Sequence, residues 1–290
     1  PPGSIFKLVQ SLIALQEGVV TASSGFPCTK SLVGCHNHPH AQSISEAIKY
    51  SCNPYYYYLV KKIIQQGKKK NNKEDAALGL KKWTKYMHSF GLGVRLDSDI
   101  YGIRKGLIPT VDFYNRWYGK NHWSFSTIRS ISIGQGEVKL TPLQMANIAV
   151  IIANKGWFYT PHFVKNWFGK KKHTGIDKKH FIPVIDGMKR VINESGGTAR
   201  LARIPNVSVC GKTGTVQNPH GKDHSVFIAF APVENPKIAI AVFIENSGFG
   251  GTWAAPTASL MIEKYLTNNI LDKEKEDRII NANLLNSNKK

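Results

Sequence analysis

The sheet is indicated most clearly by residues 226–244, VFIAFAPVENPKIAIAVFI. Residues 226–231 and 238–244 are β-branched or alternating runs, and the proline-bounded segment between them is typical of a hairpin with a longer loop. Residues 207–211 predict a third strand. Because the helical patterns come first and no β-α-β alternation is visible, the sequence predicts an α+β fold with helices packed on an antiparallel sheet. Those helices are expected at residues 4–17, 43–52, 55–66, 141–153 and 257–266.

Local signals mark several boundaries between these elements. Ser43 stands three residues before Glu46, which is the spacing of a capping box, and Pro54 can end that helix and start the next. The polar residues 67–75 predict an exposed turn. Residues 21–42 lack apolar periodicity, so we expect a loop that needs another source of order.

Composition favours one folded domain, which we expect over residues 1–268, followed by a charged tail at 269–290. Hydrophobic residues make up 42% of the 290 and charged residues 20%, as in ordinary globular proteins. No run of about 18 apolar residues indicates a membrane span. The net charge of +20 could serve an anionic partner. The Lys/Asn-rich texture of residues 68–73 instead favours solvated faces, and without a nucleic-acid motif we predict no nucleic-acid partner.

The first candidate site is Ser4 with Lys7, three residues apart on one face of the first turn of an apolar helix. A serine hydroxyl becomes a useful nucleophile when a base takes its proton, and a desolvated lysine can act as that base. The backbone N–H groups at a helix start could also bind an oxyanion. By itself this pair is common, and an exposed helix start is the simpler explanation of it.

Two further short motifs follow. Ser51-Cys52-Asn53 lies at a helix end before a proline, where polar side chains can project into a cleft, although a routine helix stop gives the same pattern. Lys212-Thr213-Gly214-Thr215 follows the predicted strand, where a lysine and two hydroxyls could hold a carboxylate. A phosphate-binding loop is excluded here, because that motif needs a glycine where Asn206 stands.

Together the three motifs read Ser-x-x-Lys, Ser-x-Asn and Lys-Thr-Gly, and this set resembles that of penicillin-recognising serine acyltransferases. Four further segments make the sequence most similar to the elongation-type penicillin-binding protein 2 family of class B penicillin-binding proteins, over about residues 1–268: Pro1-Pro2-Gly3-Ser4, Gly134-Gln135-Gly136, residues 140–146 and Phe230-Ala231-Pro232.

The resemblance implies a penicillin-binding protein and serine β-lactamase-like fold and a D,D-transpeptidase that cross-links peptidoglycan stem peptides through a serine acyl-enzyme. Ser4 would be the nucleophile and Lys7 its proton acceptor. Ser51 would relay a proton to the leaving amine, Asn53 would orient Lys7 and the substrate, and Lys212 would supply positive potential.

The resemblance also implies substrate contacts and partners. Thr213, Gly214 and Thr215 would bind the substrate, the two threonines holding its terminal carboxylate, and the backbone N–H groups of Ser4 and Thr215 would form the oxyanion hole. β-Lactams would acylate the same serine. A membrane glycan polymerase of the elongation machinery would be the protein partner, at the periplasmic face of the bacterial inner membrane. The family's anchor, pedestal and first strands are expected upstream of this sequence.

Other functions remain open at this stage. A D-alanyl-D-alanine carboxypeptidase or a β-lactamase-type hydrolase would use the same motifs, although the Glu-x-x-Leu-Asn segment of class A β-lactamases is not found between the second and third motifs. A β-lactam sensor that is acylated without turnover is a further alternative.

The loop before Ser43 is predicted to bind a structural zinc ion through Cys28, Cys35, His36 and His38, with His40 as a substitute ligand. Four such donors can close a tetrahedral site and order a loop that has few apolar residues. A Cys28–Cys35 disulfide or a free thiol pair are the alternative hypotheses. Some members of the resembled family carry zinc between the first and second motifs.

Overall fold

The fold is built on a three-stranded antiparallel sheet in the order β3 (Cys210–Val216), β4 (His224–Ala231), β5 (Ile238–Ile244). A computed structural model describes residues 1–165 and 169–284 of the chain. The central strand β4 is buried along nearly all its length, as its apolar sequence requires. The predicted hairpin of β4 and β5 is therefore confirmed, whereas the predicted strand 207–211 begins later and contains the Lys-Thr-Gly motif instead of preceding it.

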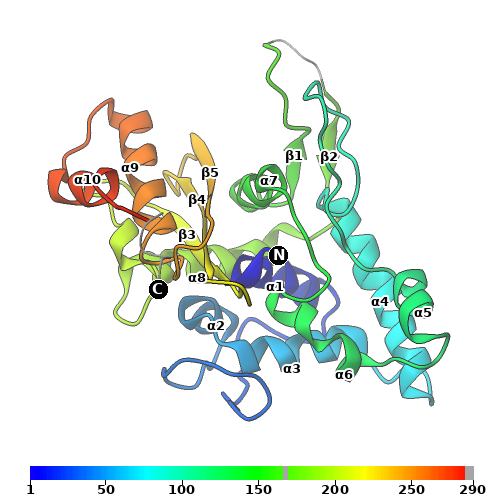
Figure 1. Cartoon of the computed structure of the whole chain (residues 1–290). Helices are drawn as coiled ribbons and strands as arrows, with labels where there is room; N and C mark the ends of the chain where they lie inside the picture. The colour runs from blue at the N-terminus through cyan, green and yellow to red at the C-terminus, as the bar shows by residue number, and fades with distance from the viewer. Residues whose placement is uncertain (166–168, 285–290) are drawn as a thin grey trace.

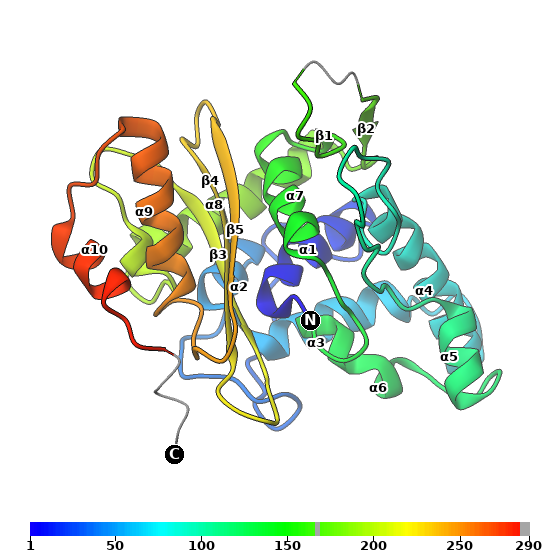
Figure 2. The same cartoon turned by 45° about the horizontal axis from the view of Figure 1, so that its top comes forward.

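Helices cover both faces of this sheet (Figures 1 and 2). One face is covered by α9 (Ala254–Thr267), and the other packs against α7 (Pro142–Ala153) and α8 (Phe181–Asn193). The predicted charged tail contains α10 (Lys273–Ile280), which packs on α9. The sheet with helices on its two faces confirms the predicted α+β class.

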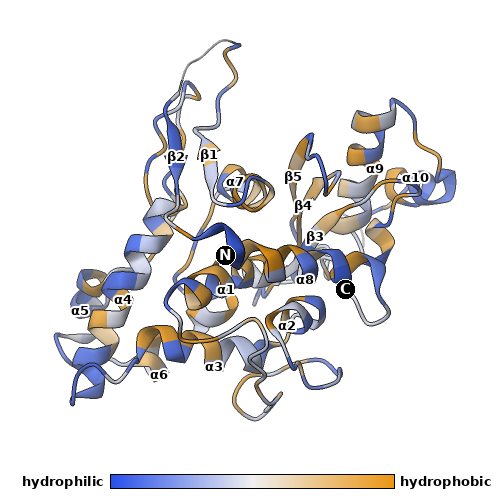
Figure 3. Cartoon of the chain, turned by 180° about the vertical axis from the view of Figure 1, so that it is seen from behind, coloured by the Kyte–Doolittle hydropathy of each residue, from blue (hydrophilic) through white to orange (hydrophobic). Residues whose placement is uncertain are grey.

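The helical half is centred on a 3-10 turn, η1 (Gly3–Phe6), that runs into α1 (Lys7–Gln16). Every residue of α1 from 7 to 15 is buried, and the helix is largely orange in Figure 3. Around it lie α2 (Ile44–Tyr50), α3 (Asn53–Ile64) and α4 (Asn72–Ser89). The all-round apolar pattern therefore predicted a buried helix correctly.

The prediction of an exposed turn over residues 67–75 is wrong for its last residues, which are helical from Asn72 and include the buried Asp75. There α4 begins at Asn72, and the Asp75 carboxylate is buried where it accepts the backbone N–H groups of Gly67, Lys68 and Lys69 at 2.8, 2.8 and 3.1 Å. Asp75 was predicted to be exposed, but its buried carboxylate holds the turn at residues 67–69 through these hydrogen bonds.

The capping box at Ser43 is only half formed. The Ser43 hydroxyl accepts the Glu46 N–H at 3.1 Å, but the Glu46 carboxylate accepts from the N–H of Gln42 at 2.8 Å and not from that of Ser43. The start of α2 is nevertheless fixed where the sequence predicted it.

The remaining elements have no counterpart in the sequence prediction. The short strands β1 (Trp157–Tyr159) and β2 (Lys171–His173) pair antiparallel and lie beside α4 and α7, in the upper right of Figure 1. Among the described residues no helix combines the length and apolar character needed to cross a membrane. These further elements are α5 (Val111–Tyr118), α6 (Phe125–Ile128), η2 (Arg129–Ile133), β1 (Trp157–Tyr159), β2 (Lys171–His173), η3 (Lys178–His180) and η4 (Arg200–Ala202).

Candidate active site

Ser4 is held at the start of η1 by the glycine before it. Gly3 has a φ of +60°, which few side chains tolerate, and its N–H donates to the Gly134 carbonyl at 2.9 Å. A Cβ atom on Gly3 would lie 2.9 Å from the Thr215 carbonyl oxygen. The nucleophile candidate is thus pressed against strand β3 by a contact that only glycine permits.

Residues of all three motifs line one cavity of about 660 Å³ between the helical half and β3. Ser4 comes from η1, Ser51 and Asn53 from the junction of α2 and α3, and Thr213 and Thr215 from β3. The structure therefore brings together side chains that are separated by some two hundred positions in the sequence.

Lys7 lies behind this cavity and is fully buried. Its Nζ donates to the Ser51 carbonyl at 2.7 Å, to Ser51 Oγ at 3.2 Å and to Asn53 Oδ1 at 2.6 Å. Burial lowers the pKa of Lys7 to about 8, although the nearby Cys35 and Cys52 act in the opposite direction. About one tenth of Lys7 is then neutral at pH 7 and about half at pH 8, and this neutral form is a competent proton acceptor.

Lys212 approaches the same hydroxyl from β3. It is fully buried, and its Nζ donates to Ser51 Oγ at 2.9 Å and to the Thr213 carbonyl at 3.0 Å. Burial, and then the charge of Lys7, lowers its pKa well below the usual range. With both Ser51 lone pairs accepting from lysines, the hydroxyl hydrogen of Ser51 is left to donate to a group in the cavity.

Ser51 owes this position to its backbone. It follows the last residue of α2 in the left-handed conformation, with φ 54° and ψ 38°, and this turn directs the chain into α3. Non-glycine residues seldom adopt such a conformation, and they concentrate at functional sites. The sequence predicted only the end of a helix here. In the structure this turn also brings Ser51 and Asn53 to the cavity.

The third motif lies in β3, where successive residues face opposite sides of the strand. Thr213 and Thr215 line the cavity, whereas Gly214 faces the other way, where a Cβ atom would lie 2.9 Å from the Pro2 carbonyl oxygen. Gly214 is therefore not among the residues that line the cavity, and its predicted contact with substrate stays a prediction. Its role is to let the chain before Ser4 pack closely on β3.

Several cavity residues escaped the sequence analysis. Thr198 is the most informative, because its Oγ1 lies 2.8 Å from Thr213 Oγ1. Gln135 donates to the Thr215 carbonyl at 3.3 Å and belongs to a segment noted for its resemblance, so a signal was present for it. Others carry no local signal, among them Arg200, Leu201, Gln217, Asp223, Phe249 and Thr252.

A group of possible metal ligands lies beside the second motif. The ligand atoms of Cys28, Cys35, His38 and Cys52 are all within 4.8 Å of one another. His38 Nε2 is 3.5 Å from Cys28 Sγ and 3.3 Å from Cys35 Sγ. The predicted ligand His36 lies outside this group, and Cys52 lies within it because the turn after α2 carries that thiol there.

This group of three thiols and one imidazole fits a tetrahedral zinc site. All four cysteines of the chain are free thiols in the structure. His38 Nδ1 lies 2.6 Å from the Pro39 carbonyl, so an N–H at Nδ1 leaves Nε2 free to bind a metal. The substitute ligand His40 instead accepts the Cys28 N–H through Nδ1 at 2.9 Å.

The metal loop and the second motif form one unit. The Asn53 N–H donates to Cys35 Sγ at 3.4 Å, and Asn53 Nδ2 donates to the Gly34 carbonyl at 2.7 Å. Cys52 is itself the middle residue of the motif. The loop is therefore bonded directly to Asn53, whose side-chain oxygen accepts a hydrogen bond from Lys7.

Comparison with known proteins agrees with this geometry. Residues 1–263 match the family described as the penicillin binding protein transpeptidase domain. The peptidoglycan D,D-transpeptidase MrdA of Haemophilus influenzae is 32% identical over 226 residues, which cover 68% of this chain and 34% of that protein. The chain thus spans about a third of this relative's length.

Solved structures share the fold over most of the chain. PBP2 of Pseudomonas aeruginosa in complex with WCK 5153 superposes with a TM-score of 0.76 and 28% identity, covering 92% of this chain and 61% of that one. The ceftriaxone acyl-enzyme of penicillin-binding protein A from Mycobacterium tuberculosis gives 0.68 and 25%, covering 92% and 61%. From the matched family and the convergence of its three motifs on one cavity, this chain belongs to the penicillin-binding protein transpeptidase domain family.

Proposed function

We propose that the protein is a peptidoglycan D,D-transpeptidase that works through an acyl-enzyme on Ser4. The observation that carries the proposal is that Ser51 Oγ accepts hydrogen bonds from Lys7 and Lys212, two buried lysines of different motifs, beside the cavity that Ser4 lines. Such a cluster costs stability in a fold and is expected where protons are moved.

In the proposed acylation, Ser4 Oγ attacks the carbonyl between the two terminal D-alanines of a stem peptide. The hydroxyl proton passes to neutral Lys7, and a new ester bond forms as the peptide bond breaks. Ser51 donates its proton to the departing amine of D-alanine and is reprotonated by the lysine pair. An amine from a second stem peptide then attacks the ester, its proton returns to Ser4, and the cross-link is released.

Thr213 and Thr215 are proposed to hold the terminal carboxylate, because both hydroxyls line the cavity on the same face of β3. The backbone N–H groups of Ser4 and Thr215 would bind the oxyanion of the tetrahedral intermediate. A β-lactam carries a carboxylate and a strained amide in an arrangement like that of the terminal carboxylate and scissile amide of the stem peptide. It would therefore acylate Ser4, and because the amide is part of a ring, no leaving group would diffuse away.

We also propose a structural zinc ion bound by Cys28, Cys35, His38 and Cys52. When bound, the ion would supply order to residues 21–42 and no reaction chemistry, since four protein ligands leave no open coordination position. Support comes from the ligand atoms of these four residues, which lie within 4.8 Å of one another. A Cys28–Cys35 disulfide remains the competing state, and it is distinguished by zinc content together with thiol counting.

The cellular setting follows from the substrate. Stem peptides are cross-linked outside the inner membrane, so we place the domain at its periplasmic face, held by an N-terminal anchor of the protein and paired with a membrane glycan polymerase. Co-purification of that polymerase with the intact protein from detergent extracts tests the partner.

The reaction itself is tested with the intact protein, a stem pentapeptide and an amine acceptor. We expect D-alanine release matched by cross-linked product, and loss of both in Ser4→Ala. Release of D-alanine with hydrolysed tetrapeptide alone would make the protein a carboxypeptidase. A stable β-lactam adduct without any turnover of peptide would make it a sensor.

A further inference from the structure

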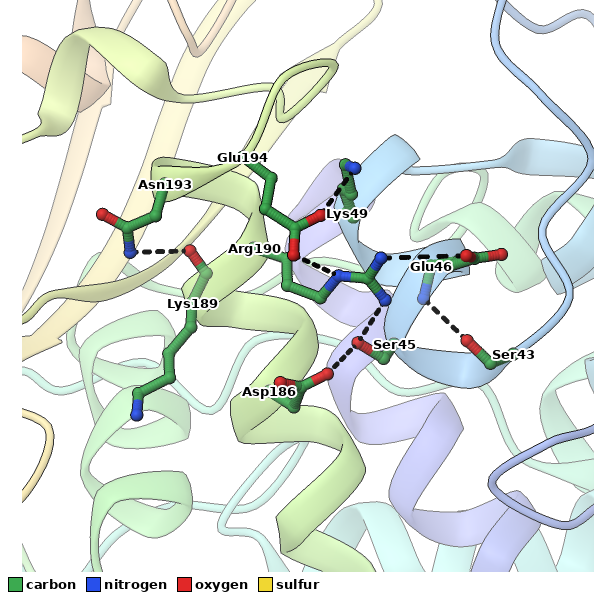
Figure 4. A network of polar contacts seen from close by, with 9 residues as sticks. All are labelled: Ser43, Ser45, Glu46, Lys49, Asp186, Lys189, Arg190, Asn193 and Glu194. Carbon is green, nitrogen blue, oxygen red and sulfur yellow. Dashed lines mark hydrogen bonds and ion pairs between the residues drawn. The ribbon is translucent and has the colours of Figure 1, made fainter.

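A polar network joins α2 to α8 outside the reaction site (Figure 4). The Glu194 carboxylate, at the end of α8, binds both helices: Lys49 Nζ of α2 lies 2.7 Å from its Oε2, and Arg190 Nε of α8 lies 2.9 Å from its Oε1. One carboxylate thus bridges two cations, each on its own oxygen.

Arg190 continues the network toward the start of α2. Its Nη1 donates to Ser45 Oγ at 3.2 Å and its Nη2 lies 3.7 Å from the Glu46 carboxylate. Ser45 in turn donates to the Asp186 carboxylate on α8. The polar face of α2 is therefore bound to α8 at both of its ends (Figure 4).

The network is more enclosed than a typical surface ion pair. The Lys49 side chain is 8% exposed and that of Glu194 is 43% exposed, so the ion pair is shielded from solvent at the lysine and partly screened at the carboxylate. Between the two ends the helices nearly touch, because a Cβ atom on Gly187 would lie 2.7 Å from Ile48 Cβ. The contact can therefore fix the relative position of α2 and α8 closely.

Both helices of this contact lead directly to the reaction site. Ser51 immediately follows α2, and α8 packs on β3, which carries Lys212. Four residues beyond Glu194, Thr198 is bonded to the side chain of Thr213. Glu194 therefore lies at the junction of the helix that delivers Ser51 and the strand that delivers Lys212.

We propose that Glu194, through Lys49 and Arg190, is a positioning residue that sets the contact between Ser51 Oγ and Lys212 Nζ. This inference rests on the acyl-enzyme function proposed above. Because Glu194 touches neither substrate nor the reacting atoms, its loss slows proton delivery by Ser51 and leaves recognition by Thr213 and Thr215 in place. A displacement of about 1 Å in a catalytic group can slow a reaction about 10²-fold, so a smaller shift at this hydrogen bond accounts for a smaller loss.

A purely structural role would have a different kinetic signature. The acylation constant k2 is first order and refers to folded molecules, so a variant that only unfolds loses burst amplitude and keeps k2. A mispositioned Ser51 lowers k2 at full amplitude, while the dissociation constant of the initial complex stays the same. Stopped-flow acylation of the intact protein by a chromogenic cephalosporin separates these quantities.

The variants are Glu194→Gln, Lys49→Met, their double mutant and the conservative Lys49→Arg. We expect k2 to fall about tenfold in Glu194→Gln, which disrupts the ion pairs with Lys49 and with Arg190, and by no more than that in Lys49→Met, which removes only the first pair. The double mutant should be no slower than Glu194→Gln, because that variant already disrupts the Lys49 pair. Lys49→Arg should stay within about threefold of the parent, since it restores the ion pair. The matched control is Lys273→Met, which removes another 2.7 Å lysine–glutamate pair from exposed α10.

Each outcome decides the matter. An unchanged k2 in Glu194→Gln overturns the proposal, and so does a k2 that falls equally in Lys273→Met. If Glu194→Gln gives no folded protein, Lys49→Met against Lys49→Arg makes the same comparison with Glu194 intact. If the parent protein forms no adduct on Ser4, the proposed function fails, which is distinct from failure of this inference.

Discussion

Lys7 and Lys212 donate to the same oxygen atom, Ser51 Oγ, at 3.2 and 2.9 Å. Both amines are fully buried, and the charge of one disfavours the charge of the other. The pair therefore holds fewer than two protons near neutral pH and can accept the proton of Ser4. Ser51 connects the two amines, so a proton taken up at Lys7 has a route to the leaving group.

Acylation is expected to speed up as pH rises through about 8, the pKa of Lys7, and then to level off. The sign follows from the role: only neutral Lys7 accepts the Ser4 proton, and its neutral fraction grows as pH increases. The measurement is k2/Kd for benzylpenicillin over the range in which the protein stays folded. A rate that is flat across this range, or that falls, would contradict the role of Lys7.

Replacing Ser51 should separate proton delivery from nucleophilic attack. In Ser51→Ala the lysine amines lose their shared oxygen, so we expect acylation to slow by about 10²–10³ while mass spectrometry still finds the adduct on Ser4. Ser11→Ala is a suitable control, because this buried hydroxyl bonds the Lys7 carbonyl and Tyr56 and lies outside the proton route. An adduct on another residue would remove Ser4 from its role.

The sequence predicted those parts of the fold and site whose causes are local. The apolar run of α1, the alternation in β4 and β5, and the helix start at Ser43 are all set by neighbouring residues. The three motifs predicted Ser4, Lys7, Ser51, Asn53 and Lys212 as site residues, because their fixed spacing is typical of helix starts, helix ends and strands. The structure places all five in or directly behind one cavity. Their convergence on one cavity came from the resemblance, not from the spacing.

What the sequence missed depends on tertiary placement. Cys52 was passed over because it is distant from Cys28 and Cys35 in sequence, and only the left-handed turn at Ser51 aims its thiol at their loop. Asp75 appeared to be a surface residue, yet the backbone of a neighbouring turn wraps around it. Thr198 and Asp223 lie in irregular segments whose approach to the cavity no periodicity reveals.

Removing zinc should impair acylation as well as stability. We expect the intact protein purified without chelator to carry about one zinc per chain, and chelation to lower the melting temperature and to slow acylation. The reason is that Asn53, which holds Lys7, is bonded to Gly34 and Cys35 of the metal loop. Zinc content, thiol counts and k2 are measured on the same samples.

Variants of the loop test the ligand set. Cys52→Ser should lose the metal, whereas His36→Ala should retain it, because His36 lies outside the group of four ligand atoms. Loss of zinc in His36→Ala with retention in Cys52→Ser would restore the ligand set first predicted from the sequence. Protein without zinc and without free thiols at Cys28 and Cys35 would establish the disulfide.

Gly3 should be more sensitive to substitution than its backbone angle alone explains. Gly3→Ala places a Cβ atom 2.9 Å from the Thr215 carbonyl oxygen and adopts a φ of +60°, while Gly18→Ala meets a similar φ of +65° with no atom within 4 Å. The left-handed conformation costs each variant about 1–2 kcal/mol. Gly3→Ala must in addition move η1 away from β3, which shifts Ser4 from the N–H of Thr215. We therefore expect both variants to lose stability in thermal melts, and only Gly3→Ala to lose acylation, by at least about tenfold. Equal acylation constants in the two variants would show that the contact between Gly3 and Thr215 does not position the nucleophile.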